Sequence, residues 1–307
     1  MPHPIMKEDP HVSRRSFAKQ LLLSTTALAA SSGLGLAAPP ASKRRIIAFS
    51  KPFQKLNFED TADLVAEVGW NGIECPVRKN GHVLPERAAE DLPRMHDALK
   101  RRGLDVTMIT TDVRKAEPAT EELLRVAAKL GIKWYRLSYW KYRAGASIPE
   151  QLREIHAQLK DLAALNGEIG ICGCFQNHSG SDQVGAPVWD IHELIKGFDT
   201  RHLACCFDIG HATLEGGQSW PIQARLMKPF AAVYYVKDLQ WKKNAEGWKA
   251  EWCPLGEGIV QPSFFRQVNE APVSVPISQH HEYPLGTQKQ MIAAMKKDLA
   301  VLNSWLS

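Results

Sequence analysis

The sequence predicts one α/β domain, a closed (β/α)8 barrel, and two observations lead to this prediction. From Arg45 onward, eight short apolar runs alternate with amphipathic helical patterns, without a break in composition. The glycine-rich turn of a nucleotide-binding sheet is also missing after the first run, which continues Ser50-Lys51-Pro52-Phe53. A hydrophobic content of 44% in 307 residues excludes a disordered chain and suffices for a large core.

The individual elements follow from hydrophobic periodicity. Helical spacing of apolar residues predicts helices over residues 86–102, 120–130, 151–165 and 289–306. Glycine suits the left-handed position that ends a helix, and we expect this role at Gly69, Gly103, Gly131 and Gly167. Short apolar runs predict the eight strands at residues 46–49, 72–76, 105–109, 134–138, 169–175, 203–207, 231–236 and 273–278.

The first 41 residues read as an export signal. Arg14 and Arg15 lie in a segment reading Ser-Arg-Arg-Ser-Phe-Ala-Lys, ahead of an uncharged apolar run at 21–38 and a small-residue stretch ending at Ala41. The arginine pair resembles a twin-arginine signal. We therefore expect a signal peptide and linker at 1–41, a barrel at 42–307, and a periplasmic or secreted protein. The alternative is a retained membrane anchor, since the run is about the shortest that spans a bilayer.

The charge and the cysteine content limit the kinds of partner and cofactor that we expect. Lys and Arg total 38 against 33 Asp and Glu, and part of this small excess lies in the first 41 residues, so the charge gives no case for nucleic acid. The six cysteines include no C-x-x-C pair and mostly lie in apolar runs. We expect them to act as small buried hydrophobic residues, with a single disulfide or a zinc-thiolate site as the alternatives.

Polar side chains follow five of the eight predicted strands. In a barrel of this type, the carboxyl ends of the strands meet at one mouth, where chemistry collects. A single His or Asp after a strand is more often a turn or capping residue, but the set together predicts a site. Strand alternation further predicts that residues 172, 174, 176, 204, 206, 208, 278, 280 and 282 face inward and that residues 171, 175 and 207 face the helices. The set is Glu74, Arg78, His82, Gln176, His178, Asp208, His211, Lys237 and Glu282.

Four motifs in this order resemble a known family. They are Asp208-x-x-His211, Lys237-Asp238, the Pro-Leu-Gly-Glu-Gly run at 254–258, and His281-Glu282-Tyr283. Their order and placement are similar to the sugar phosphate isomerase/epimerase family, within the xylose isomerase-like TIM barrel superfamily, over roughly residues 45–306. The resemblance implies a divalent ion, often manganese, held by a Glu after strand five, an Asp after six, a His after seven and a Glu after eight. The two Glu residues of that pattern also move protons.

Two of the four implied ligand positions differ in this chain. Asp208 and Glu282 match, whereas the strand-five position is Gln176 and the strand-seven position is Tyr235. Glutamine offers a neutral oxygen but no carboxylate base, and tyrosine ligates poorly unless ionised. We expect that any metal site is rebuilt from Asp208, Glu282, Gln176 and His178, or with His211. The alternative is a metal-free sugar pocket.

The resemblance implies proton transfer next to a carbonyl on a small-molecule sugar or polyol. We expect Glu282, His178 and Lys237 to be catalytic, and the substrate to be bound by Glu74, Arg78, His82, His211 and Trp140. The loop insertion at 239–253 is predicted to be a lid or a surface flap. The sequence shows no phosphate cradle and leaves a homo-oligomer open; after signal cleavage no membrane contact is expected.

Three rival functions remain at this stage. The first is a lyase or hydratase acting on an oxidised sugar. The second is an exported carbohydrate-binding barrel without catalysis, which the missing Glu and His would favour. The third is an apurinic endonuclease, which shares the barrel but needs more His and acidic ligands; the third strand continues Thr110-Thr111-Asp112 and offers no His. We disfavour the third.

Overall fold

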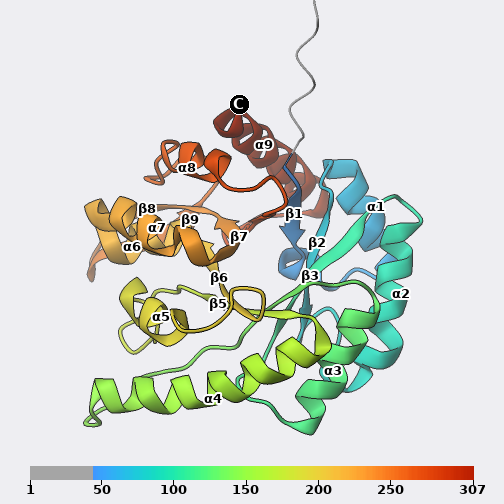
Figure 1. The fold of residues 1–307 in the computed structure, drawn as a ribbon. Helices are drawn as coiled ribbons and strands as arrows, with labels where there is room; N and C mark the ends of the chain where they lie inside the picture. Colours follow the sequence, from blue (N-terminus) through green and yellow to red (C-terminus); the bar gives the residue numbers. More distant parts are fainter. Residues whose placement is uncertain (1–43) are drawn as a thin grey trace, which may run out of the picture. The chain divides into compact units, whose positions relative to one another are not determined.

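The computed structural model describes residues 44–307, and they form a closed barrel of eight parallel strands (Figure 1). The α/β barrel prediction is therefore confirmed. Around the barrel the strands follow the order β1-β10-β7-β6-β5-β4-β3-β2. Their bounds are β1 Ile46–Phe49, β2 Gly72–Val77, β3 Asp105–Thr111, β4 Trp134–Arg136, β5 Cys172–Gln176, β6 Leu203–Asp208, β7 Ala231–Val236 and β10 Ile277–Gln279.

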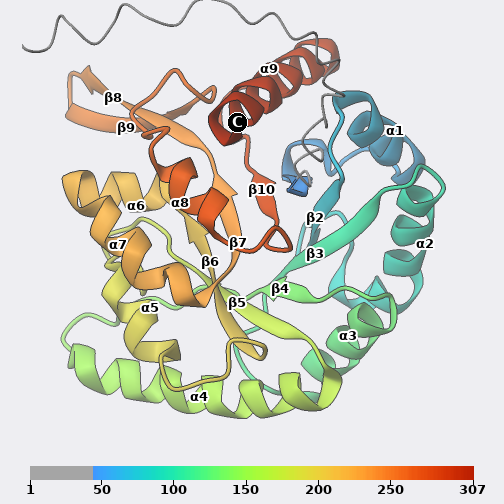
Figure 2. The same cartoon turned by 45° about the horizontal axis from the view of Figure 1, so that its top comes forward.

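Helices form the outer layer, and Figure 2 shows α1 to α4 lying outside strands β2 to β5. Short 3-10 turns precede or follow several of them, at Lys51–Phe53, Pro85–Arg87, Gly217–Ser219 and Lys228–Phe230. The α-helices are α1 Phe58–Val68, α2 Ala88–Lys100, α3 Pro118–Lys129, α4 Ile148–Ile169, α5 Val188–Ile195, α6 Ile209–Gly216, α7 Trp220–Met227, α8 Phe264–Glu270 and α9 Gln288–Leu306. None of the helices within the described part of the chain has the length and apolar character needed to cross a membrane.

Two strands begin later than the sequence predicts. Helix α4 continues through Ile169, and its left-handed end is Gly170 with φ 79°, so β5 begins only at Cys172 and Gly167 lies inside the helix. The last strand covers Ile277–Gln279 rather than 273–278, because the residues before it form a turn in which Val273 is exposed. The predicted caps at Gly69, Gly103 and Gly131 do have positive φ.

The barrel interior is filled mainly by small side chains on one wall. Cys172, Cys174, Ala204 and Cys206 pack together inside with Val233 and Tyr235, as strand alternation predicted. Their neighbours along the chain, Ile171, Phe175 and Phe207, belong instead to the larger core between strands and helices. All six cysteines are buried and free. The cysteines of β5 and β6 therefore act as small apolar residues.

The insertion after β7 is an antiparallel hairpin of β8 Asp238–Asn244 and β9 Gly247–Cys253. Asp238 at its base accepts hydrogen bonds from the backbone amides of Leu239, Gly256, Gly258 and Val260, at 2.8–3.0 Å. A methyl group on Gly258 would lie 2.2 Å from Asp238 Oδ1, so only glycine allows this close approach. The carboxylate thereby fastens the hairpin and the run at 254–258 to the end of β7.

Asp238→Ala should lower the free energy of unfolding by about 3 kcal/mol, because four amides that the carboxylate now accepts lose their partner. Urea denaturation followed by circular dichroism measures this change. The control is Asp63→Ala, which removes an exposed ion pair with Arg102 and should leave the free energy of unfolding nearly unchanged. Equal effects of the two substitutions would contradict the anchoring role of Asp238.

Candidate functional site

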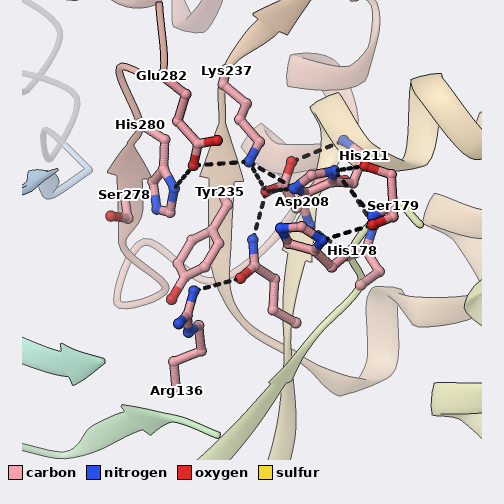
Figure 3. Close-up of polar contacts among 12 residues, drawn as sticks. Arg136, His178, Ser179, Asp208, His211, Tyr235, Lys237, Ser278, His280 and Glu282 are labelled. Carbon is pink, nitrogen blue, oxygen red and sulfur yellow. Dashed lines mark hydrogen bonds and ion pairs between the residues drawn. The ribbon is translucent and has the colours of Figure 1, made fainter. Parts of the chain in front are cut away.

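A lysine ammonium lies at the centre of the polar residues that follow the strands (Figure 3). Lys237 follows β7, and its Nζ lies 2.8 Å from His211 Nε2, 3.2 Å from Asp208 Oδ2 and 3.3 Å from Glu282 Oε1. An ammonium has three N–H donors, and here each finds an acceptor. Burial alone would favour loss of the proton, but Asp208 and Glu282 outweigh it and raise the pKa of Lys237. The side chain is therefore a buried cation.

Asp208, at the end of β6, is held by N–H donors on both oxygens. Its Oδ1 accepts the backbone amide of His211 at 3.1 Å, which caps helix α6, and its Oδ2 accepts Gln176 Nε2 at 2.8 Å. The Gln176 oxygen points the other way, to Arg136 at 2.9 Å and to the hydroxyl of Tyr139 at 2.7 Å. Because a guanidinium only donates, this contact fixes which end of the glutamine amide faces Asp208.

His211 is a neutral imidazole beside the ammonium. Burial and the charge of Lys237 lower its pKa well below the usual value. Since Lys237 can only donate, His211 Nε2 is the acceptor of this contact; the other ring nitrogen, Nδ1, lies 2.7 Å from Ser179 Oγ and 3.2 Å from the Ser179 backbone nitrogen. His178 packs against this ring at a centroid distance of 3.9 Å and is half-buried. Burial and Lys237 also lower the pKa of His178.

Glu282 connects the centre to solvent. Its side chain keeps 22% of its surface exposed, whereas those of Lys237 and Asp208 keep 2% and 0%. Burial would raise the pKa of Glu282, but Lys237 and then His280 outweigh it and hold this pKa far below its usual range. Among the groups in this cluster, Glu282 is thus an ionised carboxylate that a small molecule at the mouth can reach.

A second carboxylate, Glu74, lies deeper inside the barrel and is fully buried. Its oxygens accept hydrogen bonds from Tyr235 and Ser278, each at 2.6 Å, from Thr110, and from His280 at 3.1 Å. Burial would raise the pKa of Glu74, but His280 outweighs it, and the pKa falls to about 2. Glu74 was predicted to contact substrate; its depth and full set of partners leave no surface for that contact.

Three other predicted binding residues lie at different depths. Trp140 stacks on Phe175 at 5.2 Å and belongs to the core outside the barrel, so its position does not fit the predicted contact with a sugar. His82 bonds to Ser50, Thr61 and the Leu56 carbonyl, and burial lowers its pKa to about 4. Arg78 is half-buried over the Phe49 ring at 5.8 Å. Of these, Arg78 stays a candidate for substrate binding.

The residues implied as metal ligands do not suit a divalent ion. The inner oxygen of Asp208 faces the N–H groups of Gln176 and Lys237, and the glutamine oxygen is turned toward Arg136. Tyr235 turns into the barrel toward Glu74. No group of three His, Cys, Asp or Glu side chains between residues 44 and 307 is arranged to hold a metal. A divalent cation would here meet two fixed cations and N–H donors, which repel it.

Sequence reasoning missed Arg136, which ends β4 and lies among the central polar groups. Tyr139 follows β4 in the chain, and Trp252 of β9 covers Lys237, whose Nζ lies 4.4 Å from the ring centroid. His280 follows β10 and lies near Glu282, in phase with Ser278 as alternation along the last strand predicts. An arginine inside an apolar strand, such as Arg136, is itself a signal, because arginine is buried only when paired.

The fold and site together define a barrel with a cluster of charged and polar groups at the strand ends. A family model for the xylose isomerase-like TIM barrel matches residues 62–304, and the chain belongs to this family. The resemblance inferred from the motifs is thus confirmed at the level of this barrel family. No curated protein shows significant sequence similarity to the chain.

Solved structures with the same fold have varied chemistry. The apo structure of 3-keto-D-glucoside 4-epimerase, YcjR, from E. coli has a TM-score of 0.66 and 15% identity, over 85% of this chain and 100% of that one. The probable 3-DHS dehydratase AsbF from Bacillus anthracis has a TM-score of 0.64 and 18% identity, over 85% of this chain and 98% of that one. A sugar phosphate isomerase/epimerase from Parabacteroides distasonis has a TM-score of 0.60 and 12% identity, over 87% of this chain and 98% of that one. At these identities the likeness establishes the fold.

Glu74→Gln should destabilise the protein in a pH-dependent way. The ordinary pKa of 4.5 falls to about 2 on folding, so ionised Glu74 stabilises the fold above about pH 4.5, and this contribution is lost as the pH falls toward 2. The stability difference between wild type and Glu74→Gln should be about 3 kcal/mol between about pH 5 and 6 and should shrink at lower pH. Urea denaturation at several pH values measures it; a difference independent of pH would contradict the ionised state.

Proposed function

We propose that this chain is an enzyme that removes a proton next to the carbonyl of a sugar or polyol-derived substrate, with Glu282 as the base. The observation that carries the proposal is the contrast in exposure at the centre. Glu282 is partly exposed and ionised, while Lys237, 3.3 Å away, is buried and charged. An ionised base at the mouth of a barrel can remove the proton, and a fixed cation beside it stabilises the enolate that forms.

The chemical step moves one charge over a short distance. Glu282 takes the proton from the carbon next to the carbonyl, the C–H electrons form a C=C bond, and the carbonyl oxygen becomes an enolate oxygen. Protonated Glu282 then holds Lys237 less strongly, and the freed N–H donates to that oxygen. The ammonium thus faces two negative charges before and after the step, because Asp208 remains ionised and the enolate replaces Glu282, so the surrounding groups need little rearrangement.

The return of the proton decides the product. Gln176 cannot act as a second carboxylate base, which leaves His178 as the half-buried, neutral acid–base group near the mouth. Return to the neighbouring carbon gives isomerisation, whereas protonation of a departing hydroxyl gives elimination. We favour these two reactions over epimerisation by two carboxylates. Similarity of fold to an epimerase, an isomerase/epimerase and a dehydratase is consistent with either outcome.

Deuterium uptake tests the proposal without knowledge of the product. In D2O, the purified protein should exchange the hydrogen next to the carbonyl of at least one of D-fructose, a 3-keto-D-glucoside and 3-DHS, as followed by proton NMR. Glu282→Gln should slow this exchange by about 100- to 10,000-fold, because the base is lost while size and shape are kept. The matched control is Glu257→Gln, whose partner is Lys297 on the surface.

Full exchange by Glu282→Gln would end the assignment of the base. If no substrate exchanges, calorimetry with the same sugars, with and without manganese, separates the enzyme from a non-catalytic carbohydrate-binding barrel. Binding without exchange under both conditions supports the binding protein.

We also propose that the chain is exported by the twin-arginine route and works in the periplasm or outside the cell. The support is the sequence of residues 1–41, which lie outside the described residues. Replacing both Arg14 and Arg15 by lysine should leave the protein in the cytoplasm, as seen by cell fractionation and immunoblotting. Export at the wild-type level by this variant would refute the route.

A further inference from the structure

We propose that Lys237 is a built-in cation that takes the place of the divalent ion implied for this barrel family. The inference rests on the proposed function only for its chemical meaning; its structural basis is the arrangement of groups around Nζ. His211 Nε2, Asp208 Oδ2 and Glu282 Oε1 surround one point at 2.8–3.3 Å, and the ammonium occupies that point. An imidazole and two carboxylates are the donors that a divalent ion such as Mn²⁺ would otherwise use.

The backbone and the hairpin hold the lysine in this place. A methyl group on Gly210 would lie 2.7 Å from Lys237 Cγ, so the glycine after β6 leaves room for the lysine stem. Trp252 covers the ammonium from the hairpin side at 4.4 Å and contacts the His211 ring edge-on at 5.0 Å. Three acceptors and an aromatic face thus enclose the cation. Replacing the ammonium by water would cost free energy, because the acceptors would lose a charged partner.

The positions that differ from the metal-binding pattern fit the same interpretation. Gln176 is neutral, and this removes one negative charge that a divalent ion would require. Its oxygen is engaged by Arg136, a second buried cation. Tyr235 contacts Glu74 instead of the centre. The cluster therefore balances a monovalent cation.

Removal of the lysine should convert the centre into a metal site. Lys237→Ala frees His211 Nε2 and removes the cation that lies between the carboxylates of Asp208 and Glu282, which favours capture of another cation. We expect wild type to leave the EPR signal of free Mn²⁺ unchanged at equimolar concentration. Lys237→Ala should bind one Mn²⁺ at least tenfold more tightly, and Mn²⁺ should raise its melting temperature.

Two further variants localise the effect. Lys237→Ala combined with Asp208→Asn should lose the gained Mn²⁺ binding, because a ligand is removed. Gln176→Glu with Lys237 retained should bind Mn²⁺ no more tightly than wild type, whereas Gln176→Glu with Lys237→Ala should bind most tightly. Lys237→Met serves in place of the alanine variant if circular dichroism shows that the latter is unfolded.

Stoichiometric Mn²⁺ binding by wild type would overturn the inference, as would equal binding by Gln176→Glu with and without the lysine. A folded Lys237→Ala or Lys237→Met that gains no affinity would also overturn it. These measurements need no substrate, so their failure is distinct from a failure of the deuterium exchange that tests the proposed function.

Discussion

The candidate site depends on a single buried positive charge. An ammonium without water is costly unless every N–H has an acceptor, and Lys237 meets this requirement with side chains that follow two different strands, β6 and β10. Asp208 and His211 are far from Glu282 in the sequence, and the barrel brings them together because parallel strands end at one mouth. Burial and the same charge lower the pKa of His211, and the charge holds the pKa of Glu282 down against the effect of burial. Fold and electrostatics therefore reinforce each other here.

Much of the fold, and part of the site, could be predicted from the sequence. Alternation of apolar runs with helical spacing determines the barrel, and period-two alternation places Cys172 and Cys206 inside and Phe207 outside. The strand ends correctly pointed to the residues around Lys237. The first residues of β5 and β10 were predicted less well. An apolar helix terminus such as Ile169 and an apolar turn residue such as Val273 look like strand residues in a linear pattern.

The sequence could not show how deeply a side chain is buried or in which direction it points. Glu74 and Glu282 are both acidic residues near strand ends, yet one lies fully buried under three strands and the other reaches solvent. Trp140 follows a strand as a sugar-binding aromatic residue would, but its ring turns outward to stack on Phe175. The tilt of the strands in the barrel and the length of the turns that follow them set these orientations. A local sequence pattern encodes neither quantity.

The polar groups form a closed circuit around the mouth. From Arg136 it passes through Gln176 to Asp208, then to Lys237, Glu282, His280 and Glu74. The charge of Glu74 in turn acts on Arg136, so the circuit returns to its start. Positive and negative members alternate, and a change of sign at one position places two like charges side by side. We therefore expect a substitution that changes one of these charges to be tolerated best when an adjacent member changes with it.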